Sequence, residues 1–345
     1  MKKKVVVIGG GIAGMESSSY LSAMGYDVTL VEKEQKLGGH LLKWDRLFPT
    51  MRLGSEVLQF LNKGIQGKTK VITEAEISKI DKVQDKFNLQ MLNGDTLDAH
   101  ALLVTTGYDL FDARKKEEYG YGIYDNVYTS AELEMVFTNH QKLQTASGQT
   151  PKKIGFVHCV GSRDEKVGNT YCSKVCCVTA VKQAIEVKER LPECEVYCFY
   201  MDLRMFGMLF ETMYKDAQAK YGINFIRGRV SEASENKDKS VQVRVEDTLA
   251  GRPLKLNVDM LVLMLGFVPS QGTIKIGNML GLNFGINGFL KTMDQHLQTN
   301  VSNVPGVFFA GTCTAPNTIT NTITDARAAA AKIACYLEGS DIEYR

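Results

Sequence analysis

Four of the eight cysteines in this 345-residue chain lie close together, between His158 and Cys177. The stretch is HCVGSRDEKVGNTYCSKVCC, and its cysteines are Cys159, Cys172, Cys176 and Cys177. In a reducing compartment, clustered thiols are more typical of metal ligands or redox centres than of structural disulfides. This stretch is therefore the first candidate for chemistry in the chain.

The spacing of these cysteines, C-x12-C-x3-C-C, leaves three kinds of site open. Apolar residues recur at helical spacing over Thr170–Leu191, so we predict a helix there with Cys172 and Cys176 on one face. Cys177 and the loop-borne Cys159 can close around them, and the dipole at a helix N-terminus lowers thiol pKa values. Four such thiolates favour a [4Fe–4S] cluster, with a tetrahedral zinc ion and a redox disulfide as the alternatives.

The beginning of the chain has the pattern of a dinucleotide-binding unit. The apolar run Val5–Ile8 predicts a buried strand, a helix follows to Met24, and Asp27–Glu32 predicts the next strand. The turn before the helix matches G-x-G-x-x-G and contains Gly9, Gly11, Ile12, Ala13 and Gly14. In such a unit the helix N-terminus faces a pyrophosphate, and the acid that ends the second strand, here Glu32, accepts hydrogen bonds from ribose hydroxyls.

Three later motifs resemble those of two-dinucleotide-binding flavoproteins, and this resemblance implies FAD rather than NAD. A glycine pair follows the acidic strand end, a Thr-Gly turn ends the strand in ALLVTTGYD, and a late strand ends in Gly-Thr where that family usually has Gly-Asp. The closing helix contains four consecutive alanines, and Thr320, Asn321 or Thr322 is expected to cap it. The residues that the resemblance places at FAD are Lys33, Gly38, Gly39, His40, Thr106, Gly107, Gly311, Thr312, Asn321 and Thr322.

The middle of the chain predicts a second βαβ-containing domain inserted into the first. Segments of strand composition are Lys153–His158, Cys194–Asp202 and Asp259–Pro269. We therefore expect an α/β fold of the thioredoxin-reductase type, with an FAD-binding domain (1–112 and 270–345), a connection (113–150) and the inserted domain (151–269). In that fold a glycine fingerprint for NADPH follows the first inserted strand. Here the loop is CVGSRD instead, so we predict that nicotinamide binding has been lost.

Five motifs, GGHLLKWDRLFPT, CVGSRDE, YCSKVCC, AVKQA and YMDLRMFG, resemble the A-type subunit of heterodisulfide reductase and its relatives in sulfur-oxidising bacteria. The resemblance implies an FAD-containing electron-transfer protein, an oxidoreductase, whose [4Fe–4S] cluster is held by Cys159, Cys172, Cys176 and Cys177. It also implies that Lys182 approaches the flavin and tunes its potential, the alternative being a solvent-facing helical lysine. The expected partners are B- and C-type subunits of a heterodisulfide-reductase-like complex and a second copy of the chain in a homodimer.

Two departures from the methanogen form of the A-type subunit narrow this expectation. The extra cysteines that follow FPT in that form are replaced by MRLGSEVL, and no C-x2-C-x2-C-x3-C run occurs. We therefore expect one cluster at most, which argues against electron bifurcation and favours the short form that acts in sulfur oxidation. The rival functions are an NAD(P)H-dependent disulfide reductase using Cys172, Cys176 or Cys177, and a redox-sensing or structural flavoprotein.

Composition excludes several other classes of function. The net charge of +2 gives no reason to expect a nucleic-acid partner. No stretch approaches the ~20 apolar residues of a membrane-spanning helix, so we expect no membrane insertion and a cytoplasmic protein. Among the remaining cysteines, Cys194, Cys198 and Cys335 are expected in the core.

Overall fold

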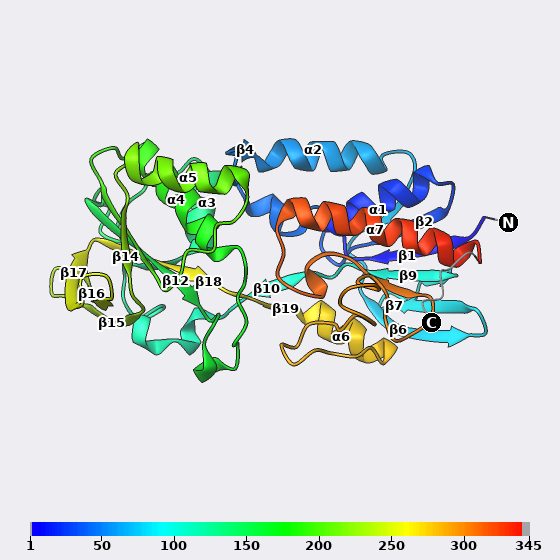
Figure 1. The fold of residues 1–345 in the computed structure, drawn as a ribbon. Coiled ribbons are helices and arrows are strands. Elements are labelled where there is room, and N and C mark those ends of the chain that lie inside the picture. The colour runs from blue at the N-terminus through cyan, green and yellow to red at the C-terminus, as the bar shows by residue number, and fades with distance from the viewer. Residues whose placement is uncertain (1, 340–345) are drawn as a thin grey trace. The chain divides into compact units, whose positions relative to one another are not determined.

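The computed structural model describes residues 2–339, and the chain forms two compact units. Unit 1 contains the chain up to Leu42, Ser55–Asp109 and everything from Val268 on; unit 2 contains Lys43–Gly54 and Leu110–Phe267. The chain crosses between the units at both ends of Lys43–Gly54 and again within two short strands, β10 (Tyr108–Leu110) and β19 (Phe267–Pro269), which pair with each other (Figure 1).

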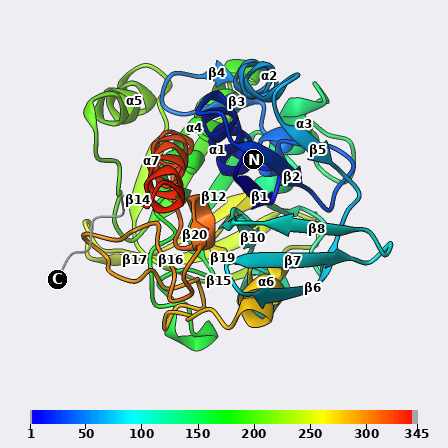
Figure 2. The same ribbon diagram turned by 90° about the vertical axis from the view of Figure 1, so that its right-hand side faces the viewer.

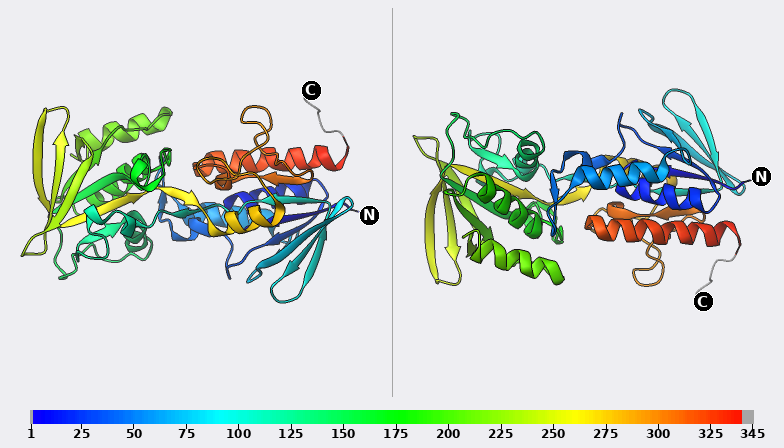
Figure 3. Two further views of the ribbon diagram at one scale, coloured as in Figure 1. Left: turned by 90° about the horizontal axis from the view of Figure 1, so that it is seen from below. Right: turned by 90° about the horizontal axis from the view of Figure 1, so that it is seen from above.

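Unit 1 is built on a five-stranded sheet in the order β20–β9–β1–β2–β5, in which all neighbours are parallel. The strands are β1 (Lys4–Ile8), β2 (Asp27–Val31), β5 (Lys70–Ile72), β9 (Ala101–Val104) and β20 (Val307–Phe309). The apolar runs of β1 and β9 are buried throughout their centres, as expected for parallel strands that are covered on both faces. Helices α1 (Ile12–Ala23) and α7 (Ile319–Leu337) lie side by side against this sheet (Figures 2 and 3).

A smaller antiparallel sheet completes unit 1. Its strands are β6 (Ile77–Val83), β7 (Lys86–Met91) and β8 (Thr96–Ala99). Helix α2 (Gly54–Ile65) precedes them in the chain, and helix α6 (Gln271–Leu280) contacts β6. Side chains of β7 alternate between exposed and buried, so one face of the small sheet contributes to the core. That core joins the small sheet to the parallel sheet and contains Val6, Phe87, Leu102, Ile276 and Phe309.

Unit 2 contains a second five-stranded parallel sheet, in the order β11–β18–β12–β13–β14. Its strands are β11 (Val127–Thr129), β12 (Lys153–Val160), β13 (Glu195–Tyr200), β14 (Asn224–Arg227) and β18 (Met260–Leu265). Helix α4 (Cys176–Arg190) packs on β12 and β13, and α3 (Ser130–Thr138) and α5 (Met208–Ala219) contact α4. Short strands β3 (Arg46–Leu47) and β4 (Arg52–Leu53) pair with each other.

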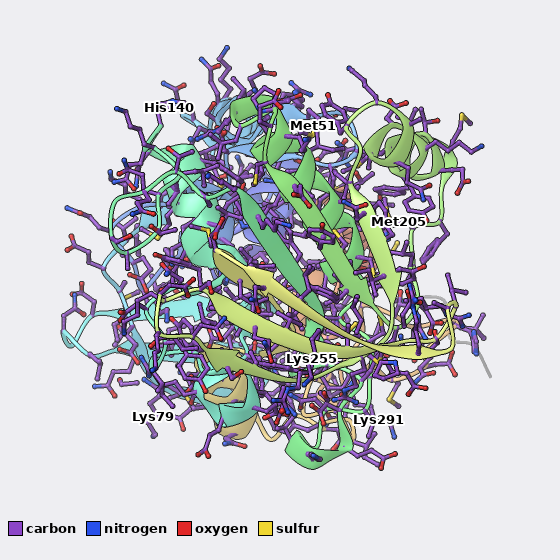
Figure 4. All side chains as sticks on the ribbon, turned by 90° about the vertical axis from the view of Figure 1, so that its left-hand side faces the viewer. Met51, Lys79, His140, Met205, Lys255 and Lys291 are labelled. Carbon is purple, nitrogen blue, oxygen red and sulfur yellow. The ribbon has the colours of Figure 1, made fainter. Side chains whose placement is uncertain are left out.

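An antiparallel sheet of three strands forms the outer layer of unit 2. It consists of β15 (Val230–Glu235), β16 (Val241–Asp247) and β17 (Arg252–Val258). Figure 4 looks onto this sheet, with the exposed Lys255 labelled on β17. The short helical turns of the chain are η1 (Gly39–Lys43), η2 (Ala113–Lys115), η3 (Glu117–Tyr119), η4 (Glu165–Val167) and η5 (Gly311–Cys313).

Several sequence predictions need correction. The helix predicted from Thr170 begins only at Cys176, because Lys174 has a left-handed backbone (φ 64°) that a helix cannot contain. Helix α7 is capped by Thr318, whose side chain accepts from the Asn321 N–H, and not by a residue from 320 to 322. Cys335 is exposed, so its predicted place in the core is wrong, whereas the predicted burial of Cys194 and Cys198 is confirmed.

The units also differ from the predicted domain limits. Lys43–Gly54 belongs to unit 2, although we expected it in the FAD-binding domain. Residues 113–150, expected as a connection, contain β11 and α3 and are part of unit 2. Between residues 2 and 339, no helix is both long and apolar enough to cross a membrane.

Candidate functional site

The turn between β1 and α1 has the close packing that its glycines predict. A Cβ atom on Gly14 would lie 1.9 Å from the carbonyl oxygen of Gly9, so helix and strand approach there more closely than any side chain permits. A Cβ on Gly11, in contrast, would meet nothing within 4 Å. Gly11 is also the N-cap of α1 and provides no side-chain hydrogen bond to the first turn of the helix. The N-terminus of α1 thus presents backbone N–H groups beside open space, which suits an anionic phosphate group.

Glu32, the acid directly after β2, holds this turn in place. Glu32 is 8% exposed, and its Oε2 atom accepts from the Gly10 N–H at 2.6 Å. The predicted second glycine pair adjoins the same turn, because Gly38 N donates to Gly10 O at 2.8 Å and a Cβ on Gly39 would lie 3.3 Å from the Gly11 Cα. Glu32 Oε1 accepts from the Glu34 N–H at 2.8 Å. Lys33 is exposed and forms an ion pair with Glu34.

The two later flavin motifs meet each other within unit 1. A Cβ on Gly107 would lie 3.6 Å from Thr312 Oγ1, so the Thr106–Gly107 turn faces the Gly311–Thr312 turn. A Cβ on Gly311 would lie 2.9 Å from the Cβ of Ala13 and 3.2 Å from a methyl carbon of Thr322. The structure thereby brings the start of α1, the start of α7 and both turns together, as the predicted FAD-binding set requires.

Two further predicted residues lie at the edge of this set. The His40 ring stacks on Tyr108, with ring centroids 4.3 Å apart, and its Nε2 lies 2.9 Å from the Tyr108 carbonyl oxygen. Asn321 is exposed and helps to line a pocket of about 830 Å³ beside α7, which is within the range of small-ligand sites. The open space at Gly11, the uncapped α1 and these converging turns fit an FAD molecule.

In unit 2, three of the four clustered cysteines converge at the start of α4. Cys176 and Cys177 are the first two residues of the helix, and the Sγ atoms of Cys159 and Cys176 lie 3.8 Å apart. All three side chains are buried. Cys172 is partly exposed and lies in the loop before the helix, where its Sγ accepts from the Lys174 N–H at 3.3 Å. The predicted sharing of one helix face by Cys172 and Cys176 is therefore wrong.

The buried thiols influence each other's ionisation. A hydrogen bond from Cys176 lowers the pKa of Cys177 to about 4, with His158 acting in the same direction against burial. A hydrogen bond from Cys176 also lowers the pKa of Cys159. The hydrogen bonds to Cys159 and Cys177 in turn raise the pKa of Cys176. Thiolates are the form that binds metal ions. Across residues 2–339, no three or more His, Cys, Asp or Glu side chains are arranged as a site for a single metal ion.

Cys159 lies in strand β12 and not in the loop where we expected it. The loop from β12 to α4, which carries Cys172, is held by buried polar side chains that the sequence analysis missed. Ser173 Oγ donates to Ser162 Oγ at 3.1 Å and accepts from the Phe267 N–H at 2.8 Å. Asp164 is 1% exposed and forms ion pairs with Lys116 Nζ at 2.6 Å and with Arg229 at 2.7 Å. In the sequence, only the polarity of these residues could have indicated such contacts, because their partners are distant in the chain.

An acid two residues after β13 also forms ion pairs within unit 2. Asp202 pairs with Arg163 at 2.8 Å and with Arg227 at 3.8 Å. Burial lowers the pKa of Arg163, but the hydrogen bond to Asp202 and the nearby Cys159 and Cys172 raise it overall. A carboxylate at this strand end is the group that contacts ribose hydroxyls in dinucleotide-binding units. Here it is committed to two arginines.

Lys182 lies in the interior of unit 2. Its side chain is 0% exposed, and its Nζ lies 2.6 Å from Glu134 Oε1 and 2.7 Å from Glu186 Oε2. Gln183 also donates to Glu134, at 2.7 Å. The alternative of a solvent-facing lysine is therefore wrong. The approach of Lys182 to a flavin stays a prediction.

Comparison with known proteins assigns the family. The family model described as "Pyridine nucleotide-disulphide oxidoreductase" matches residues 3–332. The chain belongs to this family. Two solved structures show the same two-dinucleotide-binding fold that the sequence predicted: thioredoxin reductase from T. acidophilum (TM-score 0.66, 19% identity, 98% of this chain and 99% of that one) and from Lactococcus lactis (TM-score 0.69, 17% identity, 98% and 100%).

Curated relatives of this pyridine nucleotide-disulphide oxidoreductase confirm the predicted resemblance to the A-type subunit of heterodisulfide reductase. The chain is 32% identical to that subunit of the H(2):CoB-CoM heterodisulfide,ferredoxin reductase of Methanothermobacter thermautotrophicus, covering 99% of this chain and 65% of the relative. It is 31% identical to the A-type iron-sulfur subunit of the CoB--CoM heterodisulfide reductase of Methanocaldococcus jannaschii, covering 96% and 64%. The chain thus spans less than two thirds of the length of these relatives.

Proposed function

We propose that this chain is an FAD- and [4Fe–4S]-containing electron-transfer subunit of a heterodisulfide-reductase-like complex. Its partners would be B- and C-type subunits and a second copy of the chain, and the thiol, disulfide or sulfane-sulfur chemistry would take place on the partner subunits. The proposal places the complex in disulfide metabolism, with sulfur oxidation as the specific setting. The similarity to heterodisulfide reductase subunits over nearly the whole chain supports it.

The convergence of two helix starts, those of α1 and α7, with the Thr106–Gly107 and Gly311–Thr312 turns supports the FAD site. Gly11 would face the pyrophosphate, Glu32 would orient the turn and the ribose, and Thr312 would lie along the ribityl-phosphate. The N-terminus of α7, near Asn321 and Thr322, would favour negative charge on the flavin ring because the positive end of the helix dipole lies there. Each of these residues belongs to unit 1.

The three buried thiols at the start of α4 carry the proposal of a cluster. Cys159, Cys176 and Cys177 converge there, and Cys172 lies in the loop that leads into the helix. The lowered pKa values of Cys159 and Cys177 favour the thiolate form that iron requires. The relative from Methanocaldococcus jannaschii is named an iron-sulfur subunit, which agrees with this assignment.

When bound, FAD would exchange electrons in pairs or singly, and the cluster would transfer single electrons to partner subunits. The protein would fix the cofactors, exclude water and set the local charge. Lys182 stays the residue that we expect to tune the flavin, and the corresponding measurement is the flavin midpoint potential in Lys182→Met. Glu134 and Glu186 hold its ammonium group in place.

The test is the iron, acid-labile sulfide and flavin content of protein purified without oxygen. We expect one FAD, about four irons and about four sulfides per chain. Cys159→Ser and Cys172→Ser should each lose most of the iron and keep the FAD. Cys194→Ala is the matched control, because Cys194 is a buried cysteine of the same unit outside the proposed ligand set. Wild-type protein with flavin but without iron refutes the cluster.

A second candidate function follows from one distance. The Sγ atoms of Cys159 and Cys176 are 3.8 Å apart, so a small movement would allow them to form a disulfide. The chain would then be an NAD(P)H-dependent disulfide reductase, which needs no iron. Rapid reduction of the flavin by NAD(P)H in iron-free protein would favour this function over the first.

A further inference from the structure

The flavin turn lacks the carboxylate that the resembling flavoproteins have directly after this glycine. Thr312 stands at that position, with its hydroxyl facing Gly107. A carboxylate reaches the turn from elsewhere: Asp325, inside α7, accepts the Gly311 N–H on its Oδ2 atom at 2.7 Å. Gly311 and Asp325 are 14 positions apart in the sequence, so no local sequence motif predicts this hydrogen bond.

The carboxylate of Asp325 is fixed from a second side by Asn300. Its Oδ1 atom accepts from Asn300 Nδ2 at 2.7 Å. Asn300 is 6% exposed and also bonds to the end of β20, donating to the Phe309 carbonyl at 3.0 Å and accepting the Phe309 N–H at 2.8 Å. Asp325 therefore links helix α7 to the strand end from which the turn begins.

The surroundings of the carboxylate are half-buried and lie next to open space. Burial raises the pKa of Asp325, while its bonds to Gly311 and Asn300 act in the opposite direction. Asp325 and Asn321 both line the pocket of about 830 Å³ beside α7. Gly311 itself has a φ of 79°, so the turn has a backbone conformation that depends on this glycine.

We propose that Asp325 is a positioning residue for the flavin. By accepting the Gly311 N–H, it fixes the backbone where the turn begins and so presents Thr312 to the ribityl-phosphate part of the cofactor. The carboxylate that usually follows the glycine is thus replaced by one from α7, which acts on the backbone of the turn. The inference rests on the proposed FAD site.

The first experiment is a titration of apo-protein with FAD, followed by FAD fluorescence. Asp325→Ala should weaken binding by at least about tenfold, because the turn loses its acceptor. Asp325→Asn should weaken binding less than Asp325→Ala, since its amide oxygen can still accept the Gly311 N–H, although its NH2 group cannot accept from Asn300 Nδ2. Cys335→Ala is the control on the same helix, because Cys335 is exposed near the end of α7 and does not line the pocket. Equal dissociation constants for Asp325→Ala and Cys335→Ala overturn the proposal.

A second measurement separates this inference from the proposed function. Amide hydrogen exchange in apo-protein should be faster at Gly311 in Asp325→Ala than in wild type, with Asp325→Asn in between. Unchanged exchange at Gly311 refutes the positioning role whether or not FAD binds. Failure of wild-type protein to bind FAD refutes the proposed function instead. If Asp325→Ala does not fold, Asp325→Ser serves in its place, because a serine hydroxyl is too short to reach the turn.

Discussion

The glycines of the first turn have different neighbours, and those neighbours separate a structural role from a binding role. Gly14 lies against the backbone of Gly9 and has no room for a side chain. Gly11 has an extended backbone (φ −75°, ψ −170°) that any residue can adopt, and open space where its Cβ would be. The fold therefore requires a glycine at position 14, whereas at position 11 only a ligand would require one.

Alanine substitutions should reveal this difference. We expect Gly11→Ala to leave the thermal midpoint of apo-protein unchanged and to weaken FAD binding at least about tenfold, equivalent to ~1.4 kcal/mol. Gly14→Ala should destabilise the apo-protein itself, by about 1–3 kcal/mol or more, through overpacking. Calorimetry of the apo-proteins and FAD titration check both. Tight FAD binding by Gly11→Ala would contradict the placement of the pyrophosphate.

Among individual residues, the sequence predicted functional groups that are close together in the chain and missed contacts between residues that are far apart in it. The cysteine spacing and the glycine turn were visible because each is a local pattern. The partners of Lys182 were not visible: Glu134 lies 48 positions away, so the isolated helix gave equal support to a solvent-facing lysine. Asp325 was overlooked for the same reason. Long-range polar contacts depend on the fold and leave no periodic signal.

At the scale of elements, α3 and α4 share a buried ion network. Glu186 on α4 is 2% exposed and lies within 2.7 Å of Lys182. Burial raises the pKa of Glu186 to about 7, with Glu134 adding to the rise and Lys182 opposing it. Two carboxylates and one ammonium group leave a negative charge without compensation if both acids ionise.

This raised pKa makes the packing of α3 on α4 sensitive to pH. Between the ordinary pKa of 4.5 and the raised value of about 7, Glu186 holds a proton in the folded state but not in the unfolded state. The resulting contribution to the free energy of unfolding is fully present below pH 4.5 and is lost as the pH rises through 7. We expect the free energy of unfolding of wild type to fall by ~1–3 kcal/mol between pH 5 and 7.5, relative to Glu186→Gln. Urea unfolding at both pH values measures this, with the exposed Glu193→Gln as control. Parallel pH profiles for wild type and Glu186→Gln would contradict it.

Most elements could be predicted from apolar periodicity, but their ends could not. Strand β1 begins and ends within a residue of the prediction, and helix α1 ends within a residue of it, because a strand and a helix have different periods. Helix α1 begins at Ile12, inside the predicted glycine turn, and not after Gly14. Helix α4 was predicted to begin at Thr170 because the cysteine loop contains no glycine or proline after Gly168 to mark a break. The loop is kept out of the helix by Ser162 and Ser173, whose hydroxyl contacts join segments that the sequence shows separately.

At the scale of the whole molecule, the arrangement of unit 2 bears on the source of electrons. The carboxyl end of its parallel sheet is where a nicotinamide dinucleotide binds in such folds. There, Asp202 is paired with Arg163 and Arg227, and the loop after β12 carries Cys172 and leads to Cys176 and Cys177 instead of forming a glycine fingerprint.

Neither NADH nor NADPH should therefore reduce the flavin of the purified protein. Under anaerobic conditions, the visible flavin absorption should remain after addition of either nucleotide in excess and disappear with dithionite. Rapid bleaching by NADPH would contradict the predicted loss of nicotinamide binding and would favour the disulfide-reductase function.

The pairing of β10 with β19 also bears on the ancestry of the chain. Phe111 N donates to Gly266 O at 2.9 Å, so the long segment of unit 2, Leu110–Phe267, begins and ends at neighbouring points. A gene segment encoding residues 110–267 could be gained or lost there without breaking any strand of the first parallel sheet. Lys43–Gly54 belongs to unit 2 but lies outside that segment, so unit 2 would lose this part of its structure if residues 110–267 were transferred alone.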